Sequence, residues 1–478
     1  YRKAGDDMDK YRLKFHLMPP QGWMNDPNGL CQFQGVYHVF FQYSPDDARG
    51  GDKYWGHYQS TDLLHWEYKG IVLAPDQPFD KDGVYSGSAL VDGGQMALYY
   101  TGNVKEEGGH DYIHSGRGAN TVLVTSPDGE HFSAKECLMT NDDYPSHYTC
   151  HIRDPKVWKQ GNVYYMVQGG WMNCDKGAVL LFSSPDLRHW KWIKEITTPE
   201  TFGYMWECPD YFTLPVRKEG QTEQAGILSI APQGVPSERY RYQNIYQSGY
   251  FTVQGELPEE AELGEFNEWD MGFDFYAPQT FQDEQGRRIL IGWAGIPDAE
   301  YDNEPTIERG WQHALTMPRQ LQWRFGKVYQ TPVEEFRQLR GESTIVEHGT
   351  QIVLQQADPQ EQTPWQVYEW EVTEIDSQDF LLEIEQGESG LLLHYGEGIF
   401  AMEFYGVDGA KIGRGRTVRQ FRLEQLQKVT VYLDTSLAEV YINDGEYVMT
   451  SRYYMQNEEV HAKMYCEHAK SQLYRLEV

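Results

Sequence analysis

The chain has 478 residues, more than one hydrophobic core usually serves, so two domains, or one large repeat-built domain with an appendage, are expected. It carries 41 Lys and Arg against 72 Asp and Glu, and its formal net charge of −31 repels phosphate backbones and anionic lipid surfaces. Nucleic acid and membranes are therefore not expected as partners. No segment approaches the roughly 18 apolar residues of a membrane span, and the first residues lack the apolar core of a signal peptide, so we expect a soluble chain.

Cysteine usage favours a reducing compartment. The six cysteines are scattered without a CxxC pair or a disulfide framework, at Cys31, Cys137, Cys150, Cys174, Cys208 and Cys466. Zinc would need clustered Cys and His ligands, and the sequence shows no such cluster. We therefore expect free thiols, a cytoplasmic location, no structural metal and no cofactor.

One short pattern recurs five times before the C-terminal third: a glycine followed by an apolar and aromatic run that ends in small or polar residues. The copies begin about 60 residues apart, at Gly35, Gly94, Gly161, Gly226 and Gly286. A second pattern, Ser-x-Asp-x-x-His-aromatic, interleaves with it at 60–66, 126–132 and 184–190.

Repeat units of this length are long enough for four short strands each. Their β-branched and aromatic runs, broken by Gly, Asp and Asn turns, are typical of propeller blades rather than of a parallel sheet with crossover helices. The predicted fold class is all-β, with a five-bladed β-propeller as the catalytic domain over residues 1–335. An irregular all-β domain, in which the glycines are only turn residues, remains the alternative.

The repeat stops near residue 340, and alternating runs such as FLLEIE, GLLLHY and KVTVYLD follow. Two of the last runs join at Asn443-Asp444-Gly445, a hairpin-like turn. One apolar face per strand is what two packed antiparallel sheets require, so we predict a β-sandwich over residues 341–478. A sugar-binding module and structural support or oligomer contact are both open as its role, and the sequence does not decide whether the chain forms a homo-oligomer.

A polar segment lies just before each repeated glycine. The five segments are Trp23–Gly29, Tyr85–Ser88, Arg153–Pro155, Trp206–Asp210 and Ala277–Gln279. Equivalent positions in successive propeller blades point toward the same end of the central channel, so Asp26, Asp154 and Glu207 are expected to meet there. Three carboxylates in one funnel repel one another, so at least one should have a raised pKa and provide an acid beside a base.

The neighbours of these carboxylates support the same hypothesis. Arg153 adjoins Asp154 and is suited to favour the ionised form of a nearby carboxylate and to fix a sugar hydroxyl. Glu207 lies in an apolar, aromatic stretch, where a carboxylate costs free energy unless it is paired or used. Taken singly, Asp-Pro and Asn-Gly are ordinary turn chemistry, and only the joint placement in the repeat favours a site.

The motifs WMNDPNG, RDP and ECPD, in this order, resemble glycoside hydrolase family 32, and the resemblance covers nearly the whole chain. Longer stretches, KYWGHYQSTDLLHW and RGWQHALTMPRQL, look most like the bacterial sucrose and sucrose-6-phosphate hydrolases of that family. The resemblance implies a retaining β-fructofuranosidase acting on a small fructoside, with Asp26 as nucleophile, Glu207 as general acid/base and Asp154 as transition-state stabiliser. It also implies sugar contacts from Asn25, Gln42, Trp55, Tyr85, Ser86, Arg153 and Trp293.

One segment departs from the family pattern. Many relatives carry a tryptophan shortly after Tyr-Asn-Pro, whereas this chain reads Tyr43-Ser44-Pro45 and then DDARGGDK. The leaving-group side is therefore expected to be built differently. Arg49 and Lys53 are candidates for binding a 6-phosphate on glucose, and solvated loop cations are the alternative.

Three other functions remain open from the sequence. An arabinan- or xylan-cleaving propeller enzyme uses a similar set of two Asp and one Glu, and activity on arabinan would identify it. A fructosyltransferase would form long oligosaccharides at high sucrose in place of free fructose. A non-catalytic sugar-binding propeller would lose only affinity in Asp26→Ala.

Overall fold

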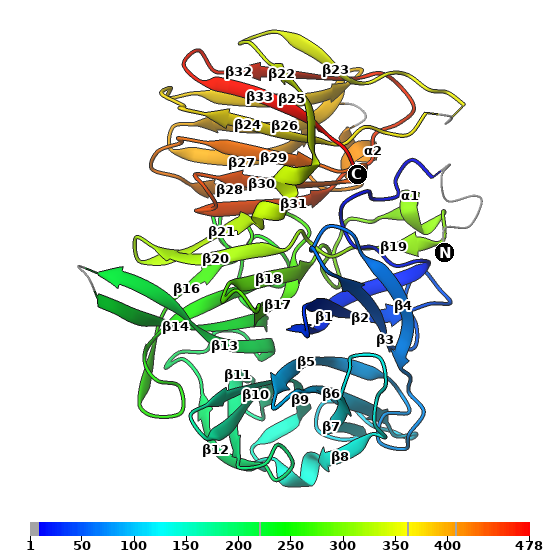
Figure 1. Ribbon diagram of the computed structural model, residues 1–478, viewed down its shortest axis with the longest axis vertical. Helices are drawn as coiled ribbons and strands as arrows, with labels where there is room; N and C mark the ends of the chain where they lie inside the picture. Colours follow the sequence, from blue (N-terminus) through cyan, green and yellow to red (C-terminus); the bar gives the residue numbers. More distant parts are fainter. Residues whose placement is uncertain (1–8, 219–220, 361–362, 407–408) are drawn as a thin grey trace.

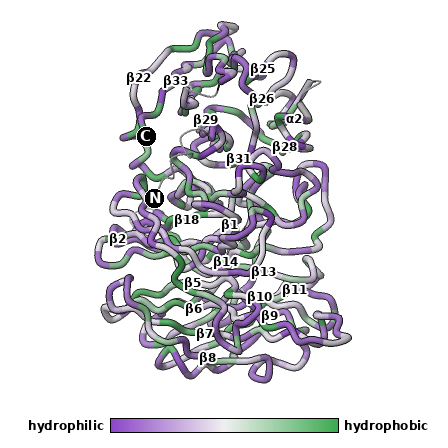
Figure 2. Tube along the Cα trace, turned by 90° about the vertical axis from the view of Figure 1, so that its right-hand side faces the viewer, coloured by the Kyte–Doolittle hydropathy of each residue, from purple (hydrophilic) through white to green (hydrophobic). Residues whose placement is uncertain are grey.

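The computed structural model describes residues 9–218, 221–360, 363–406 and 409–478. Within these ranges the chain is all-β, and its strands form seven sheets (Figure 1). Five sheets of four or five strands use the residues up to Pro332, and two six-stranded sheets use the rest. The two parts lie one above the other along the long axis of the molecule (Figures 1 and 2). This arrangement is consistent with the predicted propeller followed by a sandwich.

The first three sheets are made of strands consecutive in the sequence, apart from one short parallel addition from β19. The first sheet contains β1 (Gly22–Phe33), β2 (Val36–Ser44), β3 (Tyr54–Ser60), β4 (Glu67–Leu73) and β19 (Trp311–Gln312). The second contains β5 (Val84–Asp92), β6 (Gln95–Lys105), β7 (Arg117–Ser126) and β8 (Glu136–Met139). The third contains β9 (Tyr148–Gln160), β10 (Val163–Met172), β11 (Lys176–Ser184) and β12 (Lys191–Ile196).

The next two sheets repeat the same plan. The fourth contains β13 (Met205–Lys218), β14 (Gln221–Gln233), β15 (Gly249–Gly255) and β16 (Ala261–Glu268). The fifth contains β17 (Tyr276–Gln282), β18 (Arg288–Trp293), β20 (Arg319–Arg324) and β21 (Lys327–Pro332). Short helices in the described residues are η2 (Asn141–Asp143), α1 (Glu304–Ile307), η3 (Glu334–Leu339) and α2 (Gly409–Gly413).

Four of the five repeated glycines lie at the junction of the first two strands of their sheet. Gly35, Gly94, Gly161 and Gly286 have positive φ angles next to the start of the second strand, where glycine avoids a steric penalty. Gly226 differs, because it lies inside β14. The strands β13 and β14 are longer than their equivalents, so their junction lies before Gly226.

The second repeat forms the same turn after the third strand of three sheets. Asp62 accepts hydrogen bonds from the backbone N–H groups of Leu64 and His65, and the His65 ring lies 2.7 Å from its other oxygen. Asp128 and Asp186 bind their histidines in the same way, at 2.7 and 2.6 Å. The repeated Ser-x-Asp-x-x-His pattern therefore builds a turn, which explains its period without a catalytic role.

The C-terminal part packs two antiparallel sheets against each other. One contains β22 (Arg340–Ile345), β33 (Lys470–Leu476), β24 (Tyr368–Thr373), β29 (Val429–Leu433), β30 (Leu437–Ile442) and β31 (Tyr447–Arg452). The other contains β23 (Gln351–Gln355), β32 (Val460–Tyr465), β25 (Phe380–Gln386), β26 (Ser389–Gly396), β27 (Ile399–Tyr405) and β28 (Val418–Arg422). The turn predicted at residues 443–445 joins β30 to β31, with all three residues at positive φ.

Burial follows the two kinds of packing. In β25 every second residue is buried, because one face of the strand covers the core between the two sheets. In β2 eight consecutive residues are buried, because both faces of this inner strand are covered. No helix in the described ranges is both long and apolar enough to span a membrane.

A buried polar cluster joins the two parts. Arg319 on β20 donates to Glu439 on β30 at 2.7 Å and to Asp270 at 3.1 Å. The two ring nitrogens of His16 lie 2.9 Å from Asp434 and 2.7 Å from Glu439. Burial opposes the charged form of His16, but the two carboxylates outweigh it and raise its pKa. The opposite charges of these groups compensate one another, and the side chains are not accessible to solvent.

Removing one charge from this cluster is expected to destabilise the fold. In Glu439→Gln the buried charges of Arg319 and His16 lose their shared partner, so unfolding should cost about 3 kcal/mol less. The midpoint of urea unfolding, followed by tryptophan fluorescence, measures this loss. The control Glu374→Gln breaks an exposed pair with Lys470, which should be worth less than about 1 kcal/mol. Equal midpoints for the two variants would contradict this account of the interface.

Candidate active site

The first strand of each of the first five sheets carries a β-bulge at the same place. In each strand the register with its neighbour breaks so that two residues face one. The bulged pairs are Asn25–Asp26, Tyr85–Ser86, Asp154–Pro155, Cys208–Pro209 and Ala277–Pro278. The five polar segments predicted from the sequence therefore occupy equivalent positions. A bulge releases its residues from the ladder and redirects their side chains, here toward a common site.

Three of the bulges include backbone in the left-handed region. Asp154, Cys208 and Ala277 have φ angles of 68°, 46° and 48°. Residues with a Cβ rarely adopt this conformation, and such strain is often retained at functional sites. The prolines that follow Asp154 and Cys208 limit the alternatives of the preceding backbone.

Asp26 is held by two neutral donors. The Ser86 hydroxyl on β5 donates to its Oδ2 at 2.5 Å, and the Asn25 amide donates to its Oδ1 at 3.1 Å. The Trp23 ring N–H in turn donates to the Asn25 carbonyl oxygen at 2.8 Å. The orientation of the Asp26 carboxyl is therefore fixed from two sides.

Glu207 is held by a cation and two further donors. Arg153 donates from Nε and Nη2 to Oε2, at 3.0 and 2.9 Å. The Tyr276 hydroxyl and the Gln233 amide donate to Oε1, at 2.7 and 2.6 Å. His151 lies 2.8 Å from the remaining Arg153 nitrogen. Both carboxyl oxygens thus have defined partners.

Cys208 connects the other two carboxyl groups. Its backbone N–H donates to Asp154 Oδ2 at 2.9 Å. Its thiol sulfur lies 3.6 Å from Asp154 Oδ2 and 3.6 Å from Asp26 Oδ2. Because one sulfur atom contacts both groups, the carboxyls from β1 and β9 converge, and Glu207 is the residue next to Cys208 in the chain.

The charges of the three groups act on one another. Burial raises the pKa of Asp26, hydrogen bonds from Ser86 and Asn25 oppose the shift, and the Glu207 charge adds to it. Burial raises the pKa of Asp154 to about 7, against the opposing effect of Arg153 and with further contributions from Glu207 and Asp26. The structure thus agrees with the prediction that crowded carboxyls include at least one with a raised pKa.

The remaining predicted sugar-binding residues have different environments. Gln42 and Trp55 are buried, and they donate to the backbone of β5. Gln42 donates to Val84 O and Trp55 to Tyr85 O, both at a distance of 2.9 Å. They position the bulge that carries Ser86. Trp293 is also buried, and its ring N–H has no hydrogen-bond partner in the described residues.

Several site residues were missed by the sequence analysis. Tyr276 lies in FDFYAPQTF, and Gln233 ends the fourth repeated run, so both signals were visible but no role had been assigned to them. His313 packs edge-on against Trp23 and Trp293, with ring centres 4.3 and 4.9 Å apart. His313 lies in the RGWQHALTMPRQL stretch, but its place in the site follows only from tertiary packing.

The two candidate phosphate-binding cations have separate partners. Arg49 is exposed and makes a two-pronged contact with Glu304, with both distances 2.8 Å. Lys53 is partly buried and donates to the Ser44 hydroxyl at 3.1 Å. Nothing therefore indicates that the two cations act as a pair.

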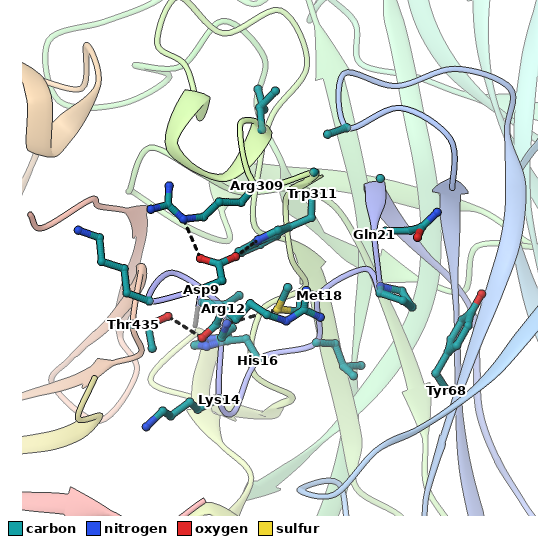
Figure 3. A pocket seen from close by; sticks show the side chains of 18 of the residues that line it. Asp9, Arg12, Lys14, His16, Met18, Gln21, Tyr68, Arg309, Trp311 and Thr435 are labelled. Atoms are coloured by element: carbon teal, nitrogen blue, oxygen red, sulfur yellow. Dashed lines mark hydrogen bonds and ion pairs between the residues drawn. The ribbon is translucent and has the colours of Figure 1, made fainter. Parts of the chain in front are cut away.

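A large cavity of about 1520 Å³ lies apart from the three carboxyls, none of which lines it (Figure 3). Asp9 is fixed there by Arg309 at 3.1 Å and by the Trp311 ring N–H at 2.8 Å. The walls of this cavity come from the N-terminal segment, the first sheet and the C-terminal part. The chemistry described above, not cavity size, identifies the candidate active site. No group of three or more His, Cys, Asp or Glu suited to a metal ion occurs among the described residues.

Two family models match the chain. Glycosyl hydrolases family 32 N-terminal domain matches residues 16–332, and glycosyl hydrolases family 32 C terminal matches residues 335–478. The chain belongs to glycosyl hydrolase family 32. The family predicted from WMNDPNG, RDP and ECPD is confirmed, and the bulged strands described above carry these family 32 motifs.

Known family 32 proteins resemble the chain over almost its whole length. A sucrose-6-phosphate hydrolase of Bacillus subtilis (strain 168) is 39% identical over 461 residues, covering 93% of this chain and 89% of the relative. A raffinose invertase of Escherichia coli is 35% identical over 467 residues, covering 95% and 92%. The structure of sucrose-6-phosphate hydrolase from Lactobacillus gasseri has a TM-score of 0.85 at 26% identity, covering 100% and 98%. A mutant β-fructofuranosidase of Bombyx mori in complex with sucrose has a TM-score of 0.82 at 29% identity, covering 98% and 94%.

Thiol labelling tests the environment described for Cys208. Burial and the charges of Asp154, Asp26 and Glu207 raise its pKa well above the usual thiol value, so its reactive thiolate should be scarce. Iodoacetamide on the folded protein, followed by peptide mass mapping, should label the exposed Cys174 and leave Cys208 unmodified. Labelling in denaturant, where both cysteines should react, is the control. Equal labelling rates in the folded protein would contradict the described burial.

Proposed function

We propose that this family 32 chain is a retaining β-fructofuranosidase. Its substrates are sucrose, sucrose-6-phosphate or short fructo-oligosaccharides, from which it releases β-D-fructose. Family membership and the names of the similar proteins support fructoside hydrolysis. The observation that carries the mechanism is the convergence of Asp26, Asp154 and Glu207 through Cys208 and Arg153.

In the proposed first step, the Asp26 carboxylate attacks the anomeric carbon of the fructosyl unit. Glu207 gives a proton to the leaving oxygen as the glycosidic bond breaks, which leaves a covalent fructosyl ester on Asp26. Water then enters, Glu207 removes its proton, and the ester bond breaks to release fructose. A retaining enzyme needs its two carboxyls about 5 to 5.5 Å apart. The contact of the Cys208 thiol with Asp26 at 3.6 Å, one residue along the chain from Glu207, supports a short separation.

The remaining groups have supporting roles in the proposal. Asp154 grips fructose hydroxyls and stabilises the oxocarbenium-like transition state. Arg153 orients Glu207 and offers its charge to the same hydroxyls. Asn25, Ser86 and Tyr85 contact the sugar directly, while Gln42 and Trp55 act through the β5 bulge, and Trp293 forms part of the aromatic wall.

We also propose the chain-level assignments that follow from this function. The five sheets of the first part are five blades of a propeller domain over residues 1–335, whose equivalent bulges form the active site at one end of the channel. Residues 341–478 form the sandwich domain. All six cysteines are free thiols, which supports a cytoplasmic location.

Stereochemistry and one substitution test the mechanism. Sucrose cleavage in aqueous methanol should give methyl β-D-fructofuranoside, detectable by NMR, because methanol replaces water at a covalent intermediate.

Asp26→Asn should lower kcat by on the order of 10⁴-fold, since the amide cannot act as nucleophile. The control Asp92→Asn, at the far end of β5 beside Lys159, should stay within about twofold of the unsubstituted enzyme. An α-methyl product, or near-normal activity in Asp26→Asn, would reject the mechanism.

The pH profile of kcat/KM should reflect the raised pKa of Asp26. The nucleophile must be ionised, so activity falls as the pH drops through this pKa, with a midpoint above the ordinary aspartate value of about 3.9. Ser86→Ala removes a hydrogen bond that favours the carboxylate and should move the midpoint up by about one pH unit. Ser88→Ala on the same strand removes a hydroxyl that donates to Pro155 O and serves as control. A downward shift in Ser86→Ala would contradict the assignment.

A further inference from the structure

Lys53 holds an ammonium group beside Trp23, whose ring N–H donates to Asn25, the chain neighbour of the proposed nucleophile. Its Nζ donates to the Ser44 hydroxyl at 3.1 Å and lies 5.0 Å from the centre of the Trp23 ring. Burial lowers its pKa to about 8, and the nearby Asp26 charge opposes this shift. Within the described parts of the chain, no carboxylate forms an ion pair with it. A cation held this deeply with one hydrogen bond retains donors for another group.

One glycine leaves space beside this ammonium, and a second packs tightly against Tyr85 next to the Lys53 stem. A side-chain carbon on Gly50 would lie 3.7 Å from Lys53 Nζ and 3.7 Å from the Trp23 ring. A side-chain carbon on Gly83 would lie 2.7 Å from the Tyr85 ring and 3.5 Å from Lys53 Cβ. Trp23, Tyr85 and Lys53 therefore border the same small region. Gly50 and Lys53 belong to the segment after Tyr43-Ser44-Pro45, where the sequence departs from the Tyr-Asn-Pro pattern of the family.

The depth of these residues indicates which part of a substrate they would meet. Asp154 and Ser86 are 4% exposed, so they lie at the bottom of the site. Trp23, Tyr85 and Lys53 are half-buried, next to the exposed residues 51–52 or to the bulge of β5. A fructosyl unit must reach Asp26 for attack, so the rest of the substrate extends outward past these three residues. Lys53 therefore lies on the leaving-group side.

An anionic substrate could bind this acidic protein only next to a local positive charge, and Lys53 supplies one. A net charge of −31 and three carboxyls in the site repel an anionic substrate, so its binding requires local positive charge. Arg153 already donates twice to Glu207 and also contacts His151. Arg49 is exposed and paired with Glu304. Unlike Arg153 and Arg49, Lys53 has no carboxylate partner among the described residues.

We propose that Lys53 selects the leaving group by binding a phosphate monoester carried by the glucose unit of the substrate. This inference rests on the proposed function, because it concerns the same site and reaction. Ser44 positions the ammonium, and the glycine at residue 50 leaves room for the phosphate oxygens. Arg49, the other cation considered from the sequence, has no part in this contact.

The test compares kcat/KM for sucrose-6-phosphate with kcat/KM for sucrose in each variant. Lys53→Met keeps the length of the side chain but removes its charge, so the ratio should fall on the order of 10- to 100-fold, the effect of losing a hydrogen bond to a charged group. Lys53→Arg restores a cation and should recover part of the ratio. Arg49→Met should leave the ratio unchanged. Thermal unfolding of each variant checks that it is folded.

A second cation near the site provides a competing assignment. Arg117 donates to Asn103 at 3.2 Å, and its charge helps to lower the pKa of the buried His151. If Arg117→Met or Arg49→Met lowers the ratio while Lys53→Met does not, Lys53 is not the phosphate-binding residue. The same conclusion follows if the unsubstituted enzyme cleaves sucrose without any preference for the phosphorylated sugar. Failure to cleave either sugar would instead reject the proposed function.

Product inhibition gives an independent readout. Glucose 6-phosphate should compete with sucrose more strongly than glucose does, and Lys53→Met should remove most of this difference. Inorganic phosphate at the same concentration shows whether the anion alone is bound. Inhibition by glucose 6-phosphate that is equal in Lys53→Met and in the unsubstituted enzyme would overturn the proposal.

Discussion

Mutual repulsion among Asp26, Asp154 and Glu207 is the constraint on which the site depends. Burial raises the pKa of Asp26 and of Asp154, and the charge of Glu207 adds to both shifts. The structure offsets this with donors of three kinds: the Ser86 hydroxyl, the Cys208 backbone N–H and the Arg153 guanidinium. Ser86 and Cys208 lie in bulges, and Arg153 directly precedes one, so the same backbone irregularities place acids and donors side by side.

This arrangement explains why much of the site could be predicted from the sequence. Each carboxyl lies in a polar segment that precedes a repeated glycine, and the strand registers place these segments at equivalent bulges. The hairpin junctions, the residues 443–445 turn and the alternation in β25 follow from local rules of glycine conformation and strand periodicity. The family motifs then supplied roles that spacing alone could not.

Other features depend on packing and were not visible in any motif. Trp55 and Gln42 were expected at the sugar, but their donors are directed at the backbone of β5, a distinction that requires the strand register. His16 and Glu439 meet although 423 positions separate them, and no local pattern marks such a pair. Arg49 appeared equivalent to Lys53 in sequence, yet only the fold shows that Glu304 binds Arg49.

Trapping the covalent intermediate tests the central claim most directly. Glu207→Gln, mixed with a fructoside whose leaving group needs no acid, should accumulate a fructosyl ester, because its breakdown requires the missing base. After acid quenching and digestion, mass spectrometry should find the added sugar on the β1 peptide, at Asp26. A label on Asp154 or on another peptide would contradict the account. So would Glu207→Gln that turns over this fructoside while no fructosyl ester can be detected.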